Sequence, residues 1–112
     1  MAVVILTMAC SKENEQTLIQ ETLCQLDTLS FSKQIRPIIT QRCLPCHDNL
    51  RAEGGYILDN YSDISAEALN GVLLGVIRHE NGYSPMPKDA PSMPACEISA
   101  IEKWIAQGAP NN

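Results

Sequence analysis

Aromatic side chains are scarce in this chain of 112 residues. They make up 4% of the sequence, with one Trp and one Phe among them. A single domain of this length therefore has few bulky side chains with which to fill its own core. We expect a flat, apolar bound group to supply part of the missing surface, and a chain that folds without such a group would contradict this expectation.

Basic side chains are also few. Eight Lys and Arg residues stand against 13 Asp and Glu residues, which gives a formal net charge of −5 at pH 7. Proteins that bind nucleic acids carry clustered positive charge, so we expect no nucleic-acid partner. An acidic protein is steered toward basic docking surfaces, although the same charge also serves solubility.

No alternating strand pattern of useful length, internal repeat or low-complexity tract occurs in the sequence. The spacing of apolar residues instead predicts an all-α fold with helices over 62–70, 72–79 and 95–107, preceded by a helical stretch in which Phe31, Ile35, Ile38 and Ile39 share one face and lead toward Cys43. Ser32 is the expected cap of the first helix, which Pro37 interrupts and restarts. Gly54 and Gly55 predict a turn or a close backbone approach to a flat ligand.

The most informative motif is Cys43-Leu-Pro-Cys46-His47. Cys-x-x-Cys followed directly by His is the attachment signature of a covalently bound c-type haem. Two thiols would add across the vinyl groups of the porphyrin, and the imidazole would become the proximal iron ligand. We therefore predict one covalent haem c, held by Cys43, Cys46 and His47.

Two other site types share part of this motif. A structural zinc site needs four ligands, usually from paired clusters, but the only other histidine is His79 and the remaining cysteines stand singly. A redox dithiol normally opens a helix within a βαβ pattern, whereas this motif follows an apolar helical stretch. The surroundings favour haem attachment.

The sixth iron ligand distinguishes an electron carrier from a haem that binds an external ligand. Met86 stands between Pro85 and Pro87, which would hold the loop extended and present the thioether rigidly. A thioether ligand favours ferrous iron and raises the reduction potential. Met86 is the predicted distal ligand, and Met93, His79 or an open site are the alternatives.

The apolar start of the chain indicates a compartment outside the cytoplasm. Residues 1–9 end in a small alanine before Cys10, as at a lipoprotein cleavage site. We predict a residual signal segment over 1–9, lipidation at Cys10, and a membrane tether over 10–30 that could be partly helical. The segment is too short to span a membrane and lacks a basic start, so a short buried strand or a cloning remnant is the alternative. For residues 11–23 a tether and a helix both fit the pattern.

Several motifs together resemble a known family. They are Phe31-Ser-Lys-Gln-Ile-Arg-Pro37-Ile-Ile, Cys43-Leu-Pro-Cys46-His47, Gly54-Gly55, Leu58-Asp-Asn-Tyr61, Pro85-Met86-Pro87 and Ile101-Glu-Lys-Trp104-Ile-Ala-Gln-Gly-Ala-Pro110. Their order resembles class I monohaem cytochrome c domains, most of all the small bacterial planctomycete-type subgroup. The resemblance covers about 31–110, within a domain of 31–112. It implies a cytochrome c fold of several short helices around one haem, with His47 and Met86 as axial ligands.

The same resemblance places other residues. It implies that the first and last helices cross beside the haem, with Trp104 in their contact. Cys24 would then lie near Cys96, so a disulfide that clips the N-terminal segment to the domain is expected, with two unpaired thiols as the alternative. One departure is Pro94-Ala95, where such domains often start the last helix with Ser or Asp.

The function implied is single-electron transfer between redox protein partners outside the cytoplasm, with no small-molecule substrate and no enzymatic turnover. A haem-based small-gas sensor or binder is the alternative, and it requires a displaceable Met86. A peroxidase would need an open distal site with an acid–base residue. An electron-accepting subunit of a larger dehydrogenase is a further form of electron transfer. Candidate partners for the haem propionates are Arg51, Arg78, Tyr56 and Tyr61, although each also fits a surface or core role.

Overall fold

The structure, a computed structural model, describes residues 12–112 and the side chains of 18 and 20–112. This part of the chain is helical and contains no strand. Its elements are α1 (Lys12–Gln25), the π-helical turn η1 (Phe31–Ile35), α2 (Arg36–Arg42), α3 (Leu44–His47), the 3₁₀ turn η2 (Glu53–Gly55), α4 (Tyr61–Leu69), α5 (Val72–Ile77) and α6 (Ala95–Ala106). The all-α prediction is confirmed at this level. The predicted signal segment 1–9 and the predicted lipidation site Cys10 lie outside the described residues.

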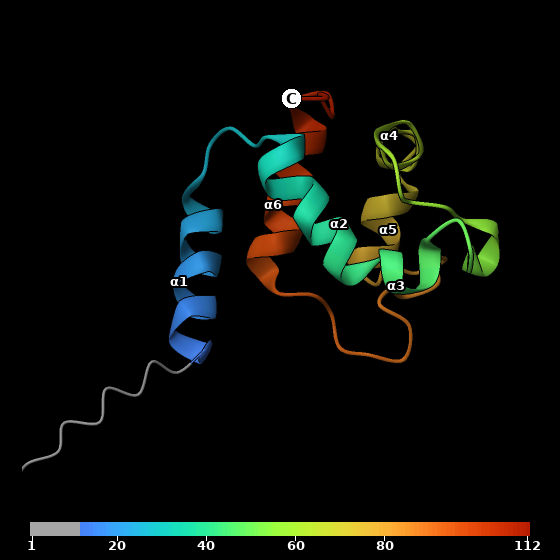
Figure 1. The fold of residues 1–112 in the computed structure, drawn as a ribbon, viewed down its shortest axis with the longest axis horizontal. Coiled ribbons are helices and arrows are strands. Elements are labelled where there is room, and N and C mark those ends of the chain that lie inside the picture. The colour runs from blue at the N-terminus through green and yellow to red at the C-terminus, as the bar shows by residue number, and fades with distance from the viewer. Residues whose placement is uncertain (1–11) are drawn as a thin grey trace, which may run out of the picture.

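Helix α1 answers the question of tether or helix for the segment before the domain. It lies beside α6 (Figure 1). Leu23 and the following Leu26 pack against the core. Cys24 and Cys96 form the expected disulfide, with Cα atoms 4.8 Å apart, inside the usual range for such bonds. Lys103 Nζ also donates to the backbone oxygens of Cys24 and Leu26, both at 3.0 Å. Residues 12–25 are therefore a helix fixed to the domain rather than an extended tether.

The first helix of the domain is capped by Ser30, so the prediction of Ser32 is wrong. Because η1 begins at Phe31, the preceding residue occupies the cap, and Ser30 Oγ accepts a hydrogen bond from the backbone N–H of Lys33. Ser32 Oγ instead donates to the backbone oxygen of Asn112 at 3.0 Å. Pro37 lies in the first turn of α2, where its missing N–H leaves no intrahelical bond unmade.

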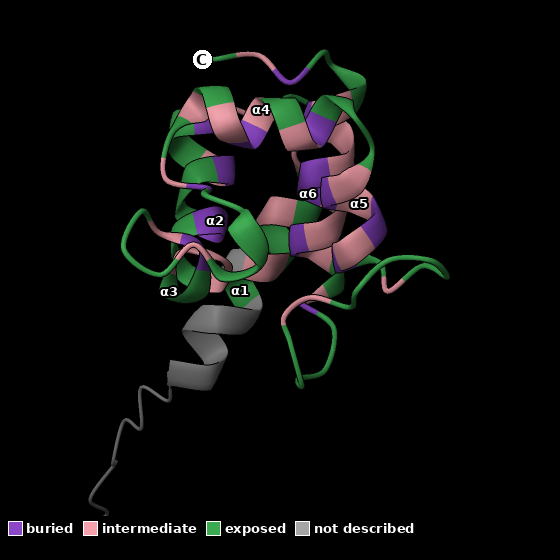
Figure 2. Ribbon diagram, turned by 90° about the vertical axis from the view of Figure 1, so that its right-hand side faces the viewer, coloured by how far each residue is buried: buried purple, intermediate pink, exposed green. Residues whose placement is uncertain are grey.

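Helix α6 supplies the centre of the core. Ala100, Ile101 and Trp104 recur at helical spacing and are fully buried or nearly so. Trp104 stacks on Phe31 of η1 with ring centroids 5.6 Å apart, in agreement with its expected place between the first and last helices. Its Nε1–H donates to the backbone oxygen of Pro110 at 2.9 Å, which satisfies the one polar atom of the ring. Figure 2 shows the buried residues on the inward sides of α4, α5 and α6.

Helices α4 and α5 form the other side of the domain. Asn60 caps α4 by accepting the backbone N–H of Asp63 at 2.9 Å, and Gly71 separates the two helices with a φ of +89°. Helix α5 ends at Ile77, earlier than predicted, because His79 has a φ of +53° that a right-handed helix cannot continue. The chain then enters the loop that carries Met86. Among residues 12–112, no helix is long and apolar enough to cross a membrane.

Candidate functional site

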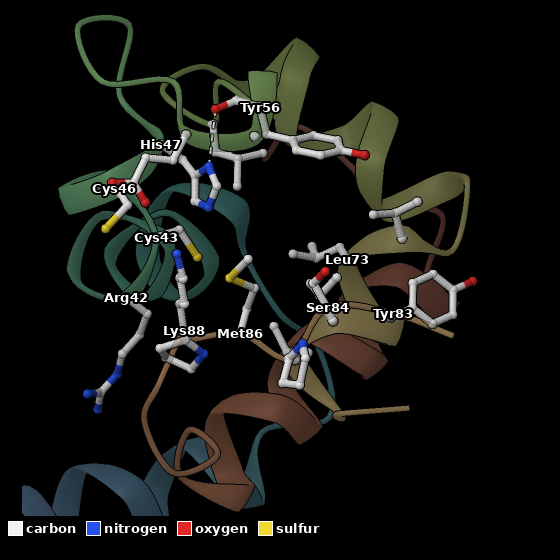
Figure 3. A pocket seen from close by; sticks show the side chains of 18 of the residues that line it. Arg42, Cys43, Cys46, His47, Tyr56, Leu73, Tyr83, Ser84, Met86 and Lys88 are labelled. Atoms are coloured by element: carbon white, nitrogen blue, oxygen red, sulfur yellow. Dashed lines mark hydrogen bonds between the residues drawn. The ribbon is translucent and has the colours of Figure 1, made fainter. Parts of the chain in front are cut away.

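A cavity of about 880 Å³ lies between the Cys43-Leu-Pro-Cys46-His47 turn and the loop that carries Met86 (Figure 3). Its volume falls within the range of small-molecule and cofactor sites. Apolar groups form most of its surface. The lining includes Cys43, Cys46, His47, Leu58, Leu73, Val76, Ile77, Met86 and Met93. All four predicted haem-binding residues therefore line one cavity.

His47, at the end of α3, is oriented by a backbone oxygen. Its Nδ1 lies 3.2 Å from the carbonyl oxygen of Tyr56, which can only accept a hydrogen bond, so Nδ1 carries the proton. The lone pair then belongs to Nε2, the nitrogen that ligates metals in this arrangement. The residue is 9% exposed, and its ring projects into the cavity in Figure 3. The backbone N–H of Leu58 donates a hydrogen bond to the backbone oxygen of His47 at 2.8 Å. This bond connects two segments that both line the cavity.

The two cysteines of the motif and His47 share one face of a single helical turn, because they follow at i, i+3 and i+4. Cys43 lies between α2 and α3 and is half-buried, whereas Cys46 is exposed. Both thiols are free, and both line the cavity. Burial raises the pKa of the Cys43 thiol to about 11, against a smaller lowering by the positive charge of Arg42.

This difference in burial predicts unequal alkylation of the two free thiols in the folded protein. The thiolate is the reactive form, and a pKa of about 11 leaves roughly 0.1% of Cys43 ionised at pH 8. We expect iodoacetamide to modify Cys46 at least about ten times faster than Cys43. The rate at Cys43 should rise about tenfold per pH unit until pH 11, because burial has moved its titration upward.

Mass spectrometry of tryptic peptides over a time course measures both rates, and the single-thiol variants Cys43→Ala and Cys46→Ala serve as controls. In 6 M guanidinium both thiols should react alike. Equal rates in the absence of denaturant would contradict the burial of the Cys43 thiol, and they are the result expected if the chain is weakly folded when no group is bound.

Met86 faces His47 from the opposite side of the cavity (Figure 3). Its peptide groups are fixed on both sides. The backbone N–H of Met86 donates to the oxygen of Val76 at 2.9 Å, and His79 Nε2 lies 2.9 Å from the oxygen of Met86, to which it donates. The loop is thus tied to α5 and to the turn that follows it. This geometry presents the thioether of Met86 to the cavity.

The two protein alternatives to Met86 are placed differently. His79 does not line the cavity, and both ring nitrogens face protein groups, because Nδ1 lies 3.4 Å from Ser92 Oγ. Met93 does line the cavity, but it is only 5% exposed and belongs to the hydrophobic core. The placement of all three favours Met86 as the distal group.

Tyr83 contacts the helix on which the Met86 loop rests. An added Cβ at Gly75, in the middle of α5, would lie 2.6 Å from Cε2 and 2.7 Å from Cγ of the Tyr83 ring. These distances are shorter than real side-chain contacts, so the ring occupies space that only a glycine leaves open. Sequence reasoning missed both residues. The signal available was a glycine inside an otherwise apolar helix.

The charged residues at the cavity differ from those expected. Of the four candidate propionate partners only Tyr56 lines the cavity, and Arg78 is paired with Glu102 at 2.9 Å. The acidic residues Glu53, Glu67 and Asp89 also line it, and its basic residues are Arg42 and Lys88. Sequence position points only weakly to Arg42 and Lys88 as cavity residues. Arg42 directly precedes the Cys43 motif, and Lys88 follows Met86 by two residues.

No group of three or more His, Cys, Asp or Glu side chains in the described part of the chain is arranged to hold a metal ion. A four-ligand zinc site is therefore not assembled from those residues. Comparison with protein-family models, curated proteins and solved structures found no match to the chain. The functional proposal consequently depends on the cavity and its donor groups.

Proposed function

We propose that this protein is a monohaem c-type cytochrome that transfers single electrons between redox proteins outside the cytoplasm. The observation that carries the proposal is the placement of the Cys43-Leu-Pro-Cys46-His47 turn opposite Met86 across one apolar cavity. Two thiols on one edge, an imidazole with a free Nε2 and a thioether are the donors that a covalently held haem with His/Met ligation requires. A flat apolar ligand also suits a chain with so few aromatic side chains.

Each of the four predicted haem-binding residues would have a separate role. Cys43 and Cys46 would each add an S–H across one vinyl double bond, forming a C–S and a C–H bond with no leaving group. His47 and Met86 would hold the iron, and haem would supply the one-electron chemistry. The Tyr56 carbonyl orients the His47 ring, and the largely apolar lining would limit the contact of a bound haem with water and so the reorganisation when its charge changes.

The wider setting of the function is part of the same proposal. Tyr56 and its neighbour Ile57 are exposed large side chains beside the cavity, where a redox partner could approach. Lipidation at Cys10 would hold the protein at a membrane surface. The protein would turn over no small-molecule substrate, so its partners would be other redox proteins.

Co-expression with a cytochrome c maturation system tests the proposal. We expect haem that stays with the denatured chain, and a weak far-red band in the ferric spectrum from the Met–iron bond. Met86→Ala should abolish this band, whereas the control Met93→Leu should retain it because Met93 belongs to the core. A wild-type protein without covalent haem would overturn the proposal. Covalent haem whose reduced form binds carbon monoxide rapidly would instead indicate a gas binder.

A further inference from the structure

Glu97 is a buried carboxylate that the proposed chemistry does not use. It lies in the first turn of α6, and the residue is 3% exposed. A carboxylate removed from water is costly unless charge and hydrogen bonds compensate for the lost solvation. Its partners therefore identify its role.

The partners of Glu97 come from two other helices. Arg42, the last residue of α2, donates from Nε to Oε1 at 2.9 Å and from Nη2 to Oε2 at 3.0 Å. Gln20 of α1 donates from Nε2 to Oε2 at 2.7 Å. The guanidinium thus binds both carboxylate oxygens, the strongest geometry available to such a pair. This hydrogen bonding raises the pKa of Arg42, so the guanidinium is charged at neutral pH.

The disulfide helps to keep the carboxylate of this pair covered. Cys96 directly precedes Glu97, and Cys24 lies one helical turn after Gln20. The bond between them holds α1 on α6 and so keeps the Gln20 amide on the carboxylate. The Glu97 side chain is 4% exposed, whereas that of Arg42 is 30% exposed. Charges in such a place act through a lower dielectric than water and are weakly screened by salt.

The two charges stand at different distances from the cavity. Arg42 lines it and directly precedes the first haem-attachment residue, Cys43. Glu97 does not line it and lies behind the guanidinium. Arg42 is thus a residue of the cavity wall, although its guanidinium points away from His47 and Met86 in Figure 3. A cation there favours the reduced state, and the carboxylate behind it opposes this effect.

We propose that the Arg42–Glu97 pair is a positioning and tuning element that sets the reduction potential of the site, with Arg42 raising it and Glu97 restraining that rise. The inference rests on the proposed electron-transfer function. It assigns a purpose to a buried charge pair that the disulfide and α1 cover.

The test is a redox titration of the haem-loaded protein and of charge-neutral variants. Arg42→Gln should lower the midpoint potential and Glu97→Gln should raise it. Each change should alter the reduction equilibrium by roughly tenfold, which is about 59 mV for a one-electron couple. The double variant should lie between the two single variants. Arg78→Gln removes an exposed guanidinium that is paired with Glu102 away from the cavity, and it should leave the potential unchanged.

Opposite signs separate tuning from a purely structural role. Loosened packing would admit water to the cavity in both single variants and shift both potentials in the same direction, which would overturn the inference and leave the proposed function intact. Arg42→Lys keeps the charge but loses the fork of hydrogen bonds, so it should lower the unfolding temperature with little change in potential. If Glu97→Gln does not fold, the comparison of Arg42→Gln with Arg42→Lys decides, and equal potentials overturn the inference. Wild-type protein without covalent haem overturns the proposed function and the inference with it.

Discussion

Cys24→Ser combined with Cys96→Ser is expected to lower the free energy of unfolding by about 4 kcal/mol. The two cysteines are 72 positions apart in the sequence, so their bond closes a long loop in the unfolded chain. The entropy removed from the unfolded state by a loop of this size corresponds to about 4 kcal/mol. Denaturant unfolding, followed by far-UV circular dichroism and by the spectrum of the proposed haem, measures the loss.

The same variant should lose helical signal before the rest of the domain unfolds. A helix of 14 residues such as α1 is marginal in isolation. Without the disulfide, the contacts that hold it are mainly the partly buried Leu23 and Leu26, the Gln20–Glu97 hydrogen bond and the bonds donated by Lys103. Wild-type protein kept in reductant is the matched control and should behave like the variant. A loss below about 1 kcal/mol, or two additional free thiols in native wild-type protein, would contradict the prediction.

The order and ends of the helices in the domain could largely be predicted from the sequence, because local rules decide them. Pro37 marks the first turn of α2, and Pro94 with Gly108 brackets α6. The capping residue was misplaced because both Ser30 and Ser32 have the right chemistry, and only the start of η1 at Phe31 decides between them. These are errors of one or two residues, within the range where helix ends are ambiguous.

The sequence could not show whether residues 11–23 form a helix, because the stability of α1 comes from its contacts with α6. Its sequence is polar, and the helix depends on a disulfide and on hydrogen bonds to α6. The Arg42–Glu97 pair joins residues 55 positions apart, and no periodicity indicates which acid such an arginine meets. By contrast, the spacing within the motif was enough to predict that Cys43, Cys46 and His47 belong to one site. The hydrogen bond of His79 to the Met86 backbone, which turns that imidazole away from the cavity, is a tertiary contact.

Gly75→Ala is expected to displace the loop that carries Met86 and, under the proposed His/Met ligation of haem, to abolish or strongly weaken the far-red Met–iron band. The added methyl group would lie 2.6 Å from the Tyr83 ring, so the ring must move. Tyr83 is partly exposed and can swing outward, but it is three residues from Met86 in the same loop. The backbone N–H of Met86 is bonded to Val76, the neighbour of Gly75, at 2.9 Å. Overpacking of this kind costs about 1–3 kcal/mol of unfolding free energy.

A double-mutant cycle with Tyr83→Ala separates this steric effect from a general loss of helix stability. Alanine is a better helix former than glycine, so without the ring Gly75→Ala should be neutral or slightly stabilising. The coupling free energy between the two positions should therefore approach the full cost of the single substitution, and the far-red band should be stronger in the double variant than in Gly75→Ala alone. Additive effects on the unfolding free energy, or an unchanged band in Gly75→Ala, would show that Tyr83 does not connect α5 to Met86. The presentation of the thioether would then depend on the hydrogen bonds to Val76 and His79 alone.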